Sequence, residues 1–238
     1  MPIVRNSFIQ MSKLTNLKGR INYISSHARQ ENLYAVYETT DRIFWTELAK
    51  CNQEEFMRSG TEGKCIEARE LIIALPESFV DYEPDKLLKL FTEHFKQNYD
   101  VECISALHHN KRKTNYHIHL IFSERKLLDE PVEKIATRNM FYDETGKHVR
   151  TKKEILDEAG QLRSGCKIIP RGEVYERNIF TIKDSRFKSD CFLDEVKWSY
   201  TDLINIYVRD DKEKLKVFDK NGVYLPMKKV GKNNPKAE

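Results

Sequence analysis

The stretch YHIHLIF at residues 116–122 decides the fold of this chain. Alternate side chains of a β-strand point to opposite faces of a sheet, so these residues divide into two sets. His117 and His119 project together from one face, and two imidazoles at this spacing can share one metal ion. The other set is apolar or aromatic and can pack under helices: Tyr116, Ile118, Leu120 and Phe122.

The residues before this strand add a third histidine. VECISALHH at 101–109 is a second strand candidate, and the polar residues NKRK at 110–113 can turn the chain back toward the first. Such a hairpin brings His108 beside the histidine pair, although His109 is also close enough to the turn to serve in its place. Three neutral imidazoles that leave coordination positions open are typical of a catalytic metal site.

A third strand candidate, ARELIIALP at 68–76, carries an acid. Alternation places Glu70 on the face opposite Leu71, Ile73 and Leu75. If that apolar face meets the helices, Glu70 shares the open face with the histidines. Its carboxylate could then accept the second N–H of a ligand imidazole and fix the tautomer, or it could help to remove a proton from a nucleophile.

Helical spacing of apolar residues predicts the remaining elements. We expect an opening strand at 2–10 and four helices, at 14–28, 41–58, 85–98 and 190–207. Strands and helices in this order favour an α+β fold, a sheet with helices on one face. The sequences YDETGK, LDEAGQ and FDKNGV (142–147, 156–161 and 218–223) predict tight turns.

Composition excludes several classes of protein. The chain has 238 residues, of which 39% are hydrophobic and 33% charged, as in a folded globular protein rather than a disordered one. No window approaches the roughly 18 apolar residues of a membrane span, so the cytoplasm is the expected compartment. The five cysteines are dispersed, which argues against a disulfide framework or a Cys-rich zinc module.

Positive charge gathers around the two histidine strands. The net charge is only +4, but the residues that join and follow these strands are mostly cationic. Clustered cations suit a phosphate backbone because each contact releases condensed counterions. We expect four of these side chains to contact DNA: Lys111, Arg112, Lys113 and Arg125. A second basic stretch closes the chain at residues 228–236.

A metal beside a tyrosine suggests phosphoryl transfer. A bound ion polarises the non-bridging oxygens of a scissile phosphate, and a phenol can attack phosphorus to form a covalent phosphotyrosine. The first tyrosine in the chain is Tyr23, followed by Tyr34 and Tyr37. Spacing alone does not choose among the three.

The order of these segments resembles a known family. GRINYISS (19–26), the strand that ends in ALP, ALHH (106–109) and HIHLIFSER (117–125) are similar to segments of the MobA/MobL, or MobQ-type, relaxases, which belong to the HUH endonucleases. By position, the resemblance makes Tyr23 the nucleophile. Glu70 matches an acidic position on the neighbouring strand. The metal ligands would be His108, His117 and His119.

The resemblance also implies a fold and a substrate. It implies a five-stranded antiparallel sheet with helices on one face, and site- and strand-specific nicking of single-stranded DNA at an origin of transfer, with religation. Mn²⁺ or Mg²⁺ is the expected ion, although imidazole ligands favour softer metals. Accessory mobilization proteins and a coupling protein are the expected partners, and no membrane is. Residues 1–205 would form the nicking domain, 140–180 a β-hairpin-rich insertion within it, and 206–238 an extension with a basic tail.

Three other interpretations stay open. Rolling-circle replication initiators and single-tyrosine transposases share the histidine pair but place the nucleophile after it, where Tyr200 and Tyr207 are the candidates. A non-catalytic origin-binding protein would keep the DNA contacts without nicking. A zinc hydrolase of small substrates is disfavoured by the basic hairpin.

Overall fold

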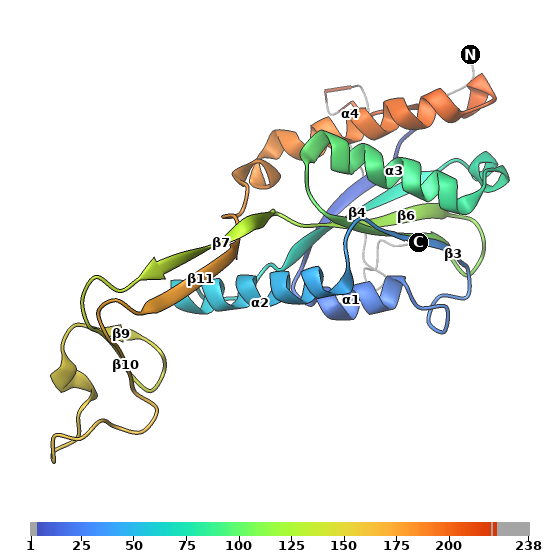
Figure 1. Ribbon diagram of the computed structural model, residues 1–238. Helices are drawn as coiled ribbons and strands as arrows, with labels where there is room; N and C mark the ends of the chain where they lie inside the picture. Colours follow the sequence, from blue (N-terminus) through green and yellow to red (C-terminus); the bar gives the residue numbers. More distant parts are fainter. Residues whose placement is uncertain (1–3, 220, 223–238) are drawn as a thin grey trace, which may run out of the picture.

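The computed structural model describes residues 4–219 and 221–222, and its centre is a five-stranded antiparallel sheet (Figure 1). The strand order is β2-β4-β6-β5-β3, and every neighbouring pair is antiparallel. The expected α+β class and five-stranded sheet are confirmed. The strands are β2 (Ile9–Leu14), β3 (Leu33–Glu38), β4 (Ala68–Leu75), β5 (Cys103–His109) and β6 (Tyr116–Phe122).

Two helices cover one face of the sheet. They are α3 (Pro84–Tyr99) and α4 (Asp190–Tyr207), and both were expected at nearly these bounds. The apolar set of β6 lies beneath them in a core rich in aromatic rings; for example, the ring centroids of Phe95 and Phe122 are 4.7 Å apart. Pro84 suits the first turn of α3 because its missing N–H would be unpaired there.

Two further helices lie on the opposite face, in addition to the expected helix-covered face. These are α1 (Leu17–Ile24) and α2 (Arg42–Ser59), which close a second apolar core over the middle of the sheet. The Asp41 carboxylate accepts the Phe44 N–H at 2.9 Å and caps α2, whereas Gly60 ends it at φ 64°. α1 is short, so the histidine end of this face stays partly open.

A long arm leaves the sheet after β6 (Figure 1). Its ribbon pairs β7 (Leu127–Ile135) with β11 (Val174–Phe180). At its tip β8 (Met140–Tyr142) pairs with both β9 (His148–Val149) and β10 (Lys167–Ile169), next to the 3₁₀ turn η2 (Lys152–Ile155). We call residues 127–180 the arm. It contains the segment 140–180 that was expected as an insertion, and the domain boundaries themselves stay a prediction.

The tight turns expected in the arm are present. Asp143 accepts the backbone N–H groups of Thr145 and Lys147, and Asp157 accepts that of Gln161. The glycines that follow have positive φ, 79° at Gly146 and 75° at Gly160. These sequences are therefore turns, as predicted.

The ends of the described chain meet. The expected strand at 2–10 is divided, because β1 (Arg5–Asn6) leaves the sheet and pairs in parallel with β12 (Leu215–Lys216). Three short 3₁₀ turns complete the elements: η1 (Glu77–Asp81), η3 (Ser185–Lys188) and η4 (Asp211–Glu213). The expected basic tail lies outside the described residues. The five cysteines are free. No helix within the described ranges is long and apolar enough to cross a membrane.

Candidate functional site

The β5–β6 hairpin brings the three histidines together. His108 lies directly opposite His117 in the ladder, and His119 lies two residues further along β6 on the same face. The ring centroids are 4.8 Å apart for His117 and His119, 5.1 Å for His108 and His119, and 5.8 Å for His108 and His117. The three imidazoles therefore form one cluster on the α1 side of the sheet.

Hydrogen bonds fix the tautomers of the histidine pair. His117 Nδ1 lies 3.0 Å from the Asn115 carbonyl oxygen, and His119 Nδ1 lies 2.9 Å from Glu70 Oε1. Carbonyl and carboxylate oxygens only accept, so each Nδ1 carries the proton and each Nε2 keeps a lone pair. Burial lowers the pKa of His117, which favours its neutral form.

The two Nε2 atoms are 3.1 Å apart. Two lone pairs at this distance repel each other unless a cation lies between them. Nitrogen ligands about 2.1 Å from one ion, at adjacent coordination positions, would be separated by roughly 3 Å. The donor chemistry of this pair thus fits a metal ion.

His108 occupies a more enclosed place than the pair. Its Nε2 donates to the Ile24 carbonyl at 2.8 Å, which leaves Nδ1 with the lone pair. Burial, together with the neighbouring His119, lowers the pKa of His108 to about 4, so its imidazole is neutral near pH 7. In residues 4–219 and 221–222, no group of three His, Cys, Asp or Glu side chains has the geometry to enclose an ion. The pair fits as it stands, and His108 must turn to join it.

Glu70 lies beneath the histidine pair. It is 2% exposed, and the Nε of Arg20 donates to both of its oxygens at 2.9 and 3.0 Å. Burial alone would raise the pKa of Glu70, but hydrogen bonds from His119 and Arg20 outweigh it and hold this pKa below its ordinary value. The carboxylate is thus ionised, and its oxygens already accept hydrogen bonds from Arg20 and His119. Of the two roles left open by the sequence, this favours fixing the His119 tautomer over removing a proton.

Arg20 is a site residue that sequence reasoning missed. Besides binding Glu70, its guanidinium carbon lies 5.3 Å from the centroid of the Tyr23 ring. A signal was available, because residues three apart share a helix face and Arg20 stands three before Tyr23 in α1. Arg20 therefore links the proposed nucleophile to the histidine cluster.

A cavity of about 350 Å³ joins these groups. Tyr23 and Arg20 line it from α1, and Lys111 lines it from the β5–β6 turn. The clustered histidines His108, His117 and His119 also line it, and part of His109 lies at its edge. Tyr23 is 43% exposed, so its phenol is accessible to a ligand in this cavity.

The alternative residues near the turn face elsewhere. His109 points to the other side of β5, where its Nδ1 lies 2.9 Å from the Tyr34 hydroxyl and its Nε2 3.2 Å from Glu77 Oε2. Tyr37 donates to Glu93 at 2.6 Å, and this bond, aided by burial, raises the pKa of Tyr37 to about 12. Neither Tyr34 nor Tyr37 lines the cavity.

The two tyrosines of α4 belong to the other face of the sheet. Tyr200 is 1% exposed, and its hydroxyl donates to the Phe91 carbonyl at 2.8 Å. Burial raises the pKa of Tyr200 well above its ordinary value. Tyr207 packs on the same core. The sheet thus separates both candidates of the rolling-circle interpretation from the histidines.

The four cations expected to contact DNA do not lie together. Lys111, Arg112 and Lys113 are exposed at the β5–β6 turn, beside the cavity. Arg125 follows the far end of β6, about 20 Å away at 3.3 Å per residue. It is 4% exposed, forms an ion pair with Glu55 and donates to the Thr181 carbonyl at 2.7 Å. Its burial and these contacts disfavour a DNA contact by Arg125, and they tie the base of the arm to α2.

Comparison with known protein families identifies a match. Residues 44–224 match the model of the MobA/MobL family, which is more than half of the chain. The matched segment includes Glu70 and the three clustered histidines, whereas Arg20 and Tyr23 precede it. No curated protein matches the sequence.

Proposed function

The chain belongs to the MobA/MobL family of mobilization relaxases, and we propose that it nicks one DNA strand at an origin of transfer through Tyr23. The observation that carries this proposal is the cavity that Tyr23 and Arg20 share with the clustered histidines. The substrate is single-stranded DNA, whose scissile phosphate enters this cavity. Accessory mobilization proteins and a coupling protein remain predicted partners.

Three imidazole nitrogens would hold the ion. They are Nε2 of His117, Nε2 of His119 and, after rotation, Nδ1 of His108, the three atoms whose lone pairs are free. Mn²⁺ or Mg²⁺ would supply charge that polarises the non-bridging oxygens of the scissile phosphate. Glu70 holds the His119 ring in the tautomer that this binding needs.

Tyr23 would carry out the covalent step. Its phenol loses a proton to water in the cavity, and the phenolate oxygen bonds to phosphorus while the bond from phosphorus to the 3′ oxygen breaks. The departing 3′ oxygen takes a proton from water. Arg20, whose guanidinium lies over the Tyr23 ring, would help to hold this ring at the cavity. One phosphodiester is exchanged for another, so attack by the 3′ hydroxyl can rejoin the strand.

A covalent-adduct assay tests this function. The protein is incubated with Mn²⁺ and a labelled single-stranded oligonucleotide that carries the origin of its own element, and a protein–DNA band is sought on a denaturing gel. We expect a band with the intact protein, and at least a roughly thousand-fold loss in Tyr23→Phe, because the nucleophilic oxygen is removed. Tyr34→Phe is the matched control, since Tyr34 is also exposed near the turn but lies outside the cavity.

Each other outcome has a definite meaning. A band that survives Tyr23→Phe would place the nucleophile elsewhere, and mapping the labelled peptide would identify it. Origin binding by the intact protein without a band in Mn²⁺ or Mg²⁺ would support the non-catalytic origin-binding interpretation instead.

A further inference from the structure

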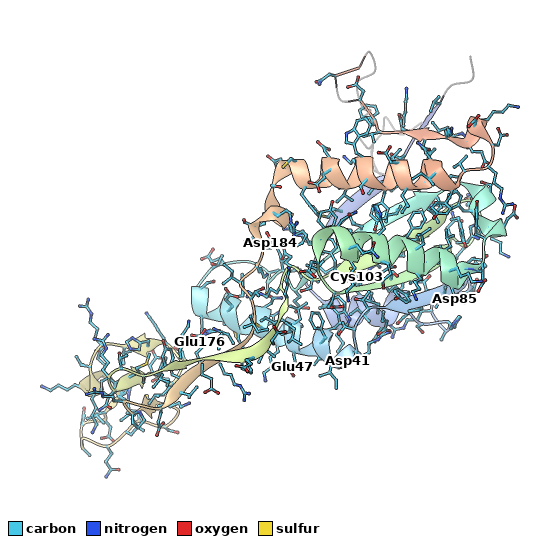
Figure 2. All side chains as sticks on the ribbon, turned by 45° about the horizontal axis from the view of Figure 1, so that its top comes forward. Asp41, Glu47, Asp85, Cys103, Glu176 and Asp184 are labelled. Atoms are coloured by element: carbon cyan, nitrogen blue, oxygen red, sulfur yellow. The ribbon has the colours of Figure 1, made fainter. Side chains whose placement is uncertain are left out.

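A large cleft lies away from the histidines, between α2 and the arm. Its volume is about 1410 Å³, roughly four times that of the catalytic cavity. One wall is α2 from Glu47 onward, and the other is formed by β11 and the β8–β9 turn. Figure 2 labels one residue of each wall, Glu47 on α2 and Glu176 on β11. Nothing in the proposed nicking step uses this cleft.

We propose that this cleft is a second DNA site, which holds single-stranded DNA next to the nick. The inference rests on the proposed function for the identity of the strand. It deepens that function by giving the arm a role in binding the nucleotides beyond the catalytic cavity.

Two lysine side chains that line the cleft are available to bind phosphates. Glu176 is neutralised within the protein, since its oxygens lie 3.1 Å from Arg58 Nη1 and 3.0 Å from Lys134 Nζ. Lys50 on α2 and Lys147 on the β8–β9 turn are exposed, and neither forms an ion pair with any residue in the described ranges. One such amine stands on each wall, as a groove that tracks a phosphate backbone requires.

Aromatic rings in the arm favour a single strand over a duplex. Tyr142 and Tyr175 line the cleft and are half-buried, so each offers part of a ring to a ligand. Unpaired bases stack on such rings, whereas the bases of a duplex are already stacked on one another. Glu47 and Glu54 on the α2 wall can accept hydrogen bonds from base amino groups, which face outward only when the strand is unpaired.

The catalytic cavity lies beyond the first turn of α2, and the cleft extends along this helix from Glu47 to its end. At its first turn, Arg42 Nη2 donates to the Ser25 hydroxyl at 3.3 Å, next to the helix that carries Tyr23. At its last turn, Arg58, Ser59 and Gly60 line the cleft. Eighteen helical residues span about 27 Å, which corresponds to roughly eight nucleotides at a spacing of about 3.4 Å, and fewer if the strand is stretched. One strand can therefore occupy both sites.

A length series of oligonucleotides tests the proposal. The shortest oligonucleotide covers only the nick site. Thymidine tracts extend it on the 5′ or the 3′ side by 4, 8 or 12 nucleotides, since such grooves bind about 4 nucleotides or more. Affinity is measured by fluorescence anisotropy in EDTA, so that no nicking occurs. For the intact protein, we expect extension past about eight nucleotides on one side to tighten binding by roughly ten-fold.

The double variant Lys50→Ala/Lys147→Ala should lose this gain. Its affinity for the shortest oligonucleotide, and the nicking of that oligonucleotide in Mn²⁺, should equal those of the intact protein. The slope of log affinity against log salt for the longest oligonucleotide should fall by about 1.4, for two lost phosphate contacts. Lys152→Ala/Lys153→Ala is the matched control, because these lysines lie in the arm but outside the cleft.

Three results would overturn the proposal. In the first, the double variant binds the longest oligonucleotide as tightly as the intact protein does. In the second, it loses as much affinity for the shortest oligonucleotide as for the longest. In the third, affinity rises only when the extension is a duplex. Thermal unfolding of both double variants shows whether the fold is kept. Failure of the proposed function looks different, because the intact protein would then leave the shortest oligonucleotide uncut while the gain with length still depended on Lys50 and Lys147.

Discussion

The two faces of the central sheet differ in what they bury. Under α3 and α4, the side chains of β6 meet a continuous apolar core in which Phe95 and Tyr200 are almost completely buried. Under α1, the same strand presents His117 and His119, and the buried neighbours are the charged or polar Glu70 and His108. One face is closed by packing, and the end of the other is organised by hydrogen bonds.

The difference shows how one strand can serve stability and chemistry together. Because side chains alternate along β6, a residue that stabilises the fold stands directly beside one that is available for binding. Substitutions at neighbouring positions should then separate the two roles.

Ile118→Ala and His117→Ala are adjacent changes on opposite faces of β6. Ile118 is 0% exposed, so its truncation should lower the free energy of unfolding by about 2–5 kcal/mol. His117→Ala should cost less than about 1 kcal/mol, yet reduce covalent adduct at least roughly hundred-fold, because a metal ligand is removed. Urea denaturation and the adduct assay measure the two effects. A comparable loss of stability in both variants would show that the histidine face contributes to stability as much as the apolar face does.

Sequence reasoning was sound where a pattern depends on one strand or one helix. The alternation of residues 116–122 predicted the faces of β6, and apolar spacing predicted α2, α3 and α4 closely. It predicted α1 and α2 as helices without placing them on the second face. The strand β5 is buried at six of its seven positions, which requires cover on both faces, but Ser105 and His108 interrupt the continuous apolar run that would indicate this from the sequence.

Contacts between distant segments were harder to predict. β3 is an edge strand, and β7 carries four acidic or basic residues and a proline, so neither shows a clear alternation. The clustering of the histidines with Glu70 followed from strand pairing. Arg20 was missed because only the packing of α1 on the sheet brings it to Glu70. Arg125 is close in sequence to the histidines, but it lies beyond the far end of β6, where it pairs with Glu55.

Binding of Mn²⁺ at the histidine cluster should raise the free energy of unfolding. An ion at a hundred times its dissociation constant adds about 2.7 kcal/mol to the free energy of unfolding, or roughly 5–10 °C in Tm for a chain of this size. We expect this shift in the intact protein, its reversal by EDTA and its absence in His117→Ala. Ile118→Ala, although less stable, should keep the shift. An equal shift in His117→Ala would place the bound ion outside the histidine cluster.

Glu70→Gln tests how the buried carboxylate acts. If Glu70 holds the His119 tautomer, the variant should need about 10–100-fold more Mn²⁺ for half-maximal nicking, while the rate at saturating Mn²⁺ recovers to within a few-fold. If Glu70 instead removes the nucleophile's proton, saturating Mn²⁺ would not restore the rate. Glu77→Gln is the matched control, because Glu77 contacts His109 on the opposite face.

Tyr200→Phe should have the smallest effect, and it addresses the remaining alternative nucleophile. The change removes one buried hydrogen bond to the Phe91 carbonyl and should cost about 1 kcal/mol, or roughly 2–4 °C in Tm. Covalent adduct should stay at the level of the intact protein, because the sheet separates this phenol from the histidines. Loss of adduct in a folded Tyr200→Phe protein would move the nucleophile to α4, the arrangement of rolling-circle initiators. The nicking reaction would then have to take place on the sheet face that α3 and α4 cover, where the side chains are closely packed.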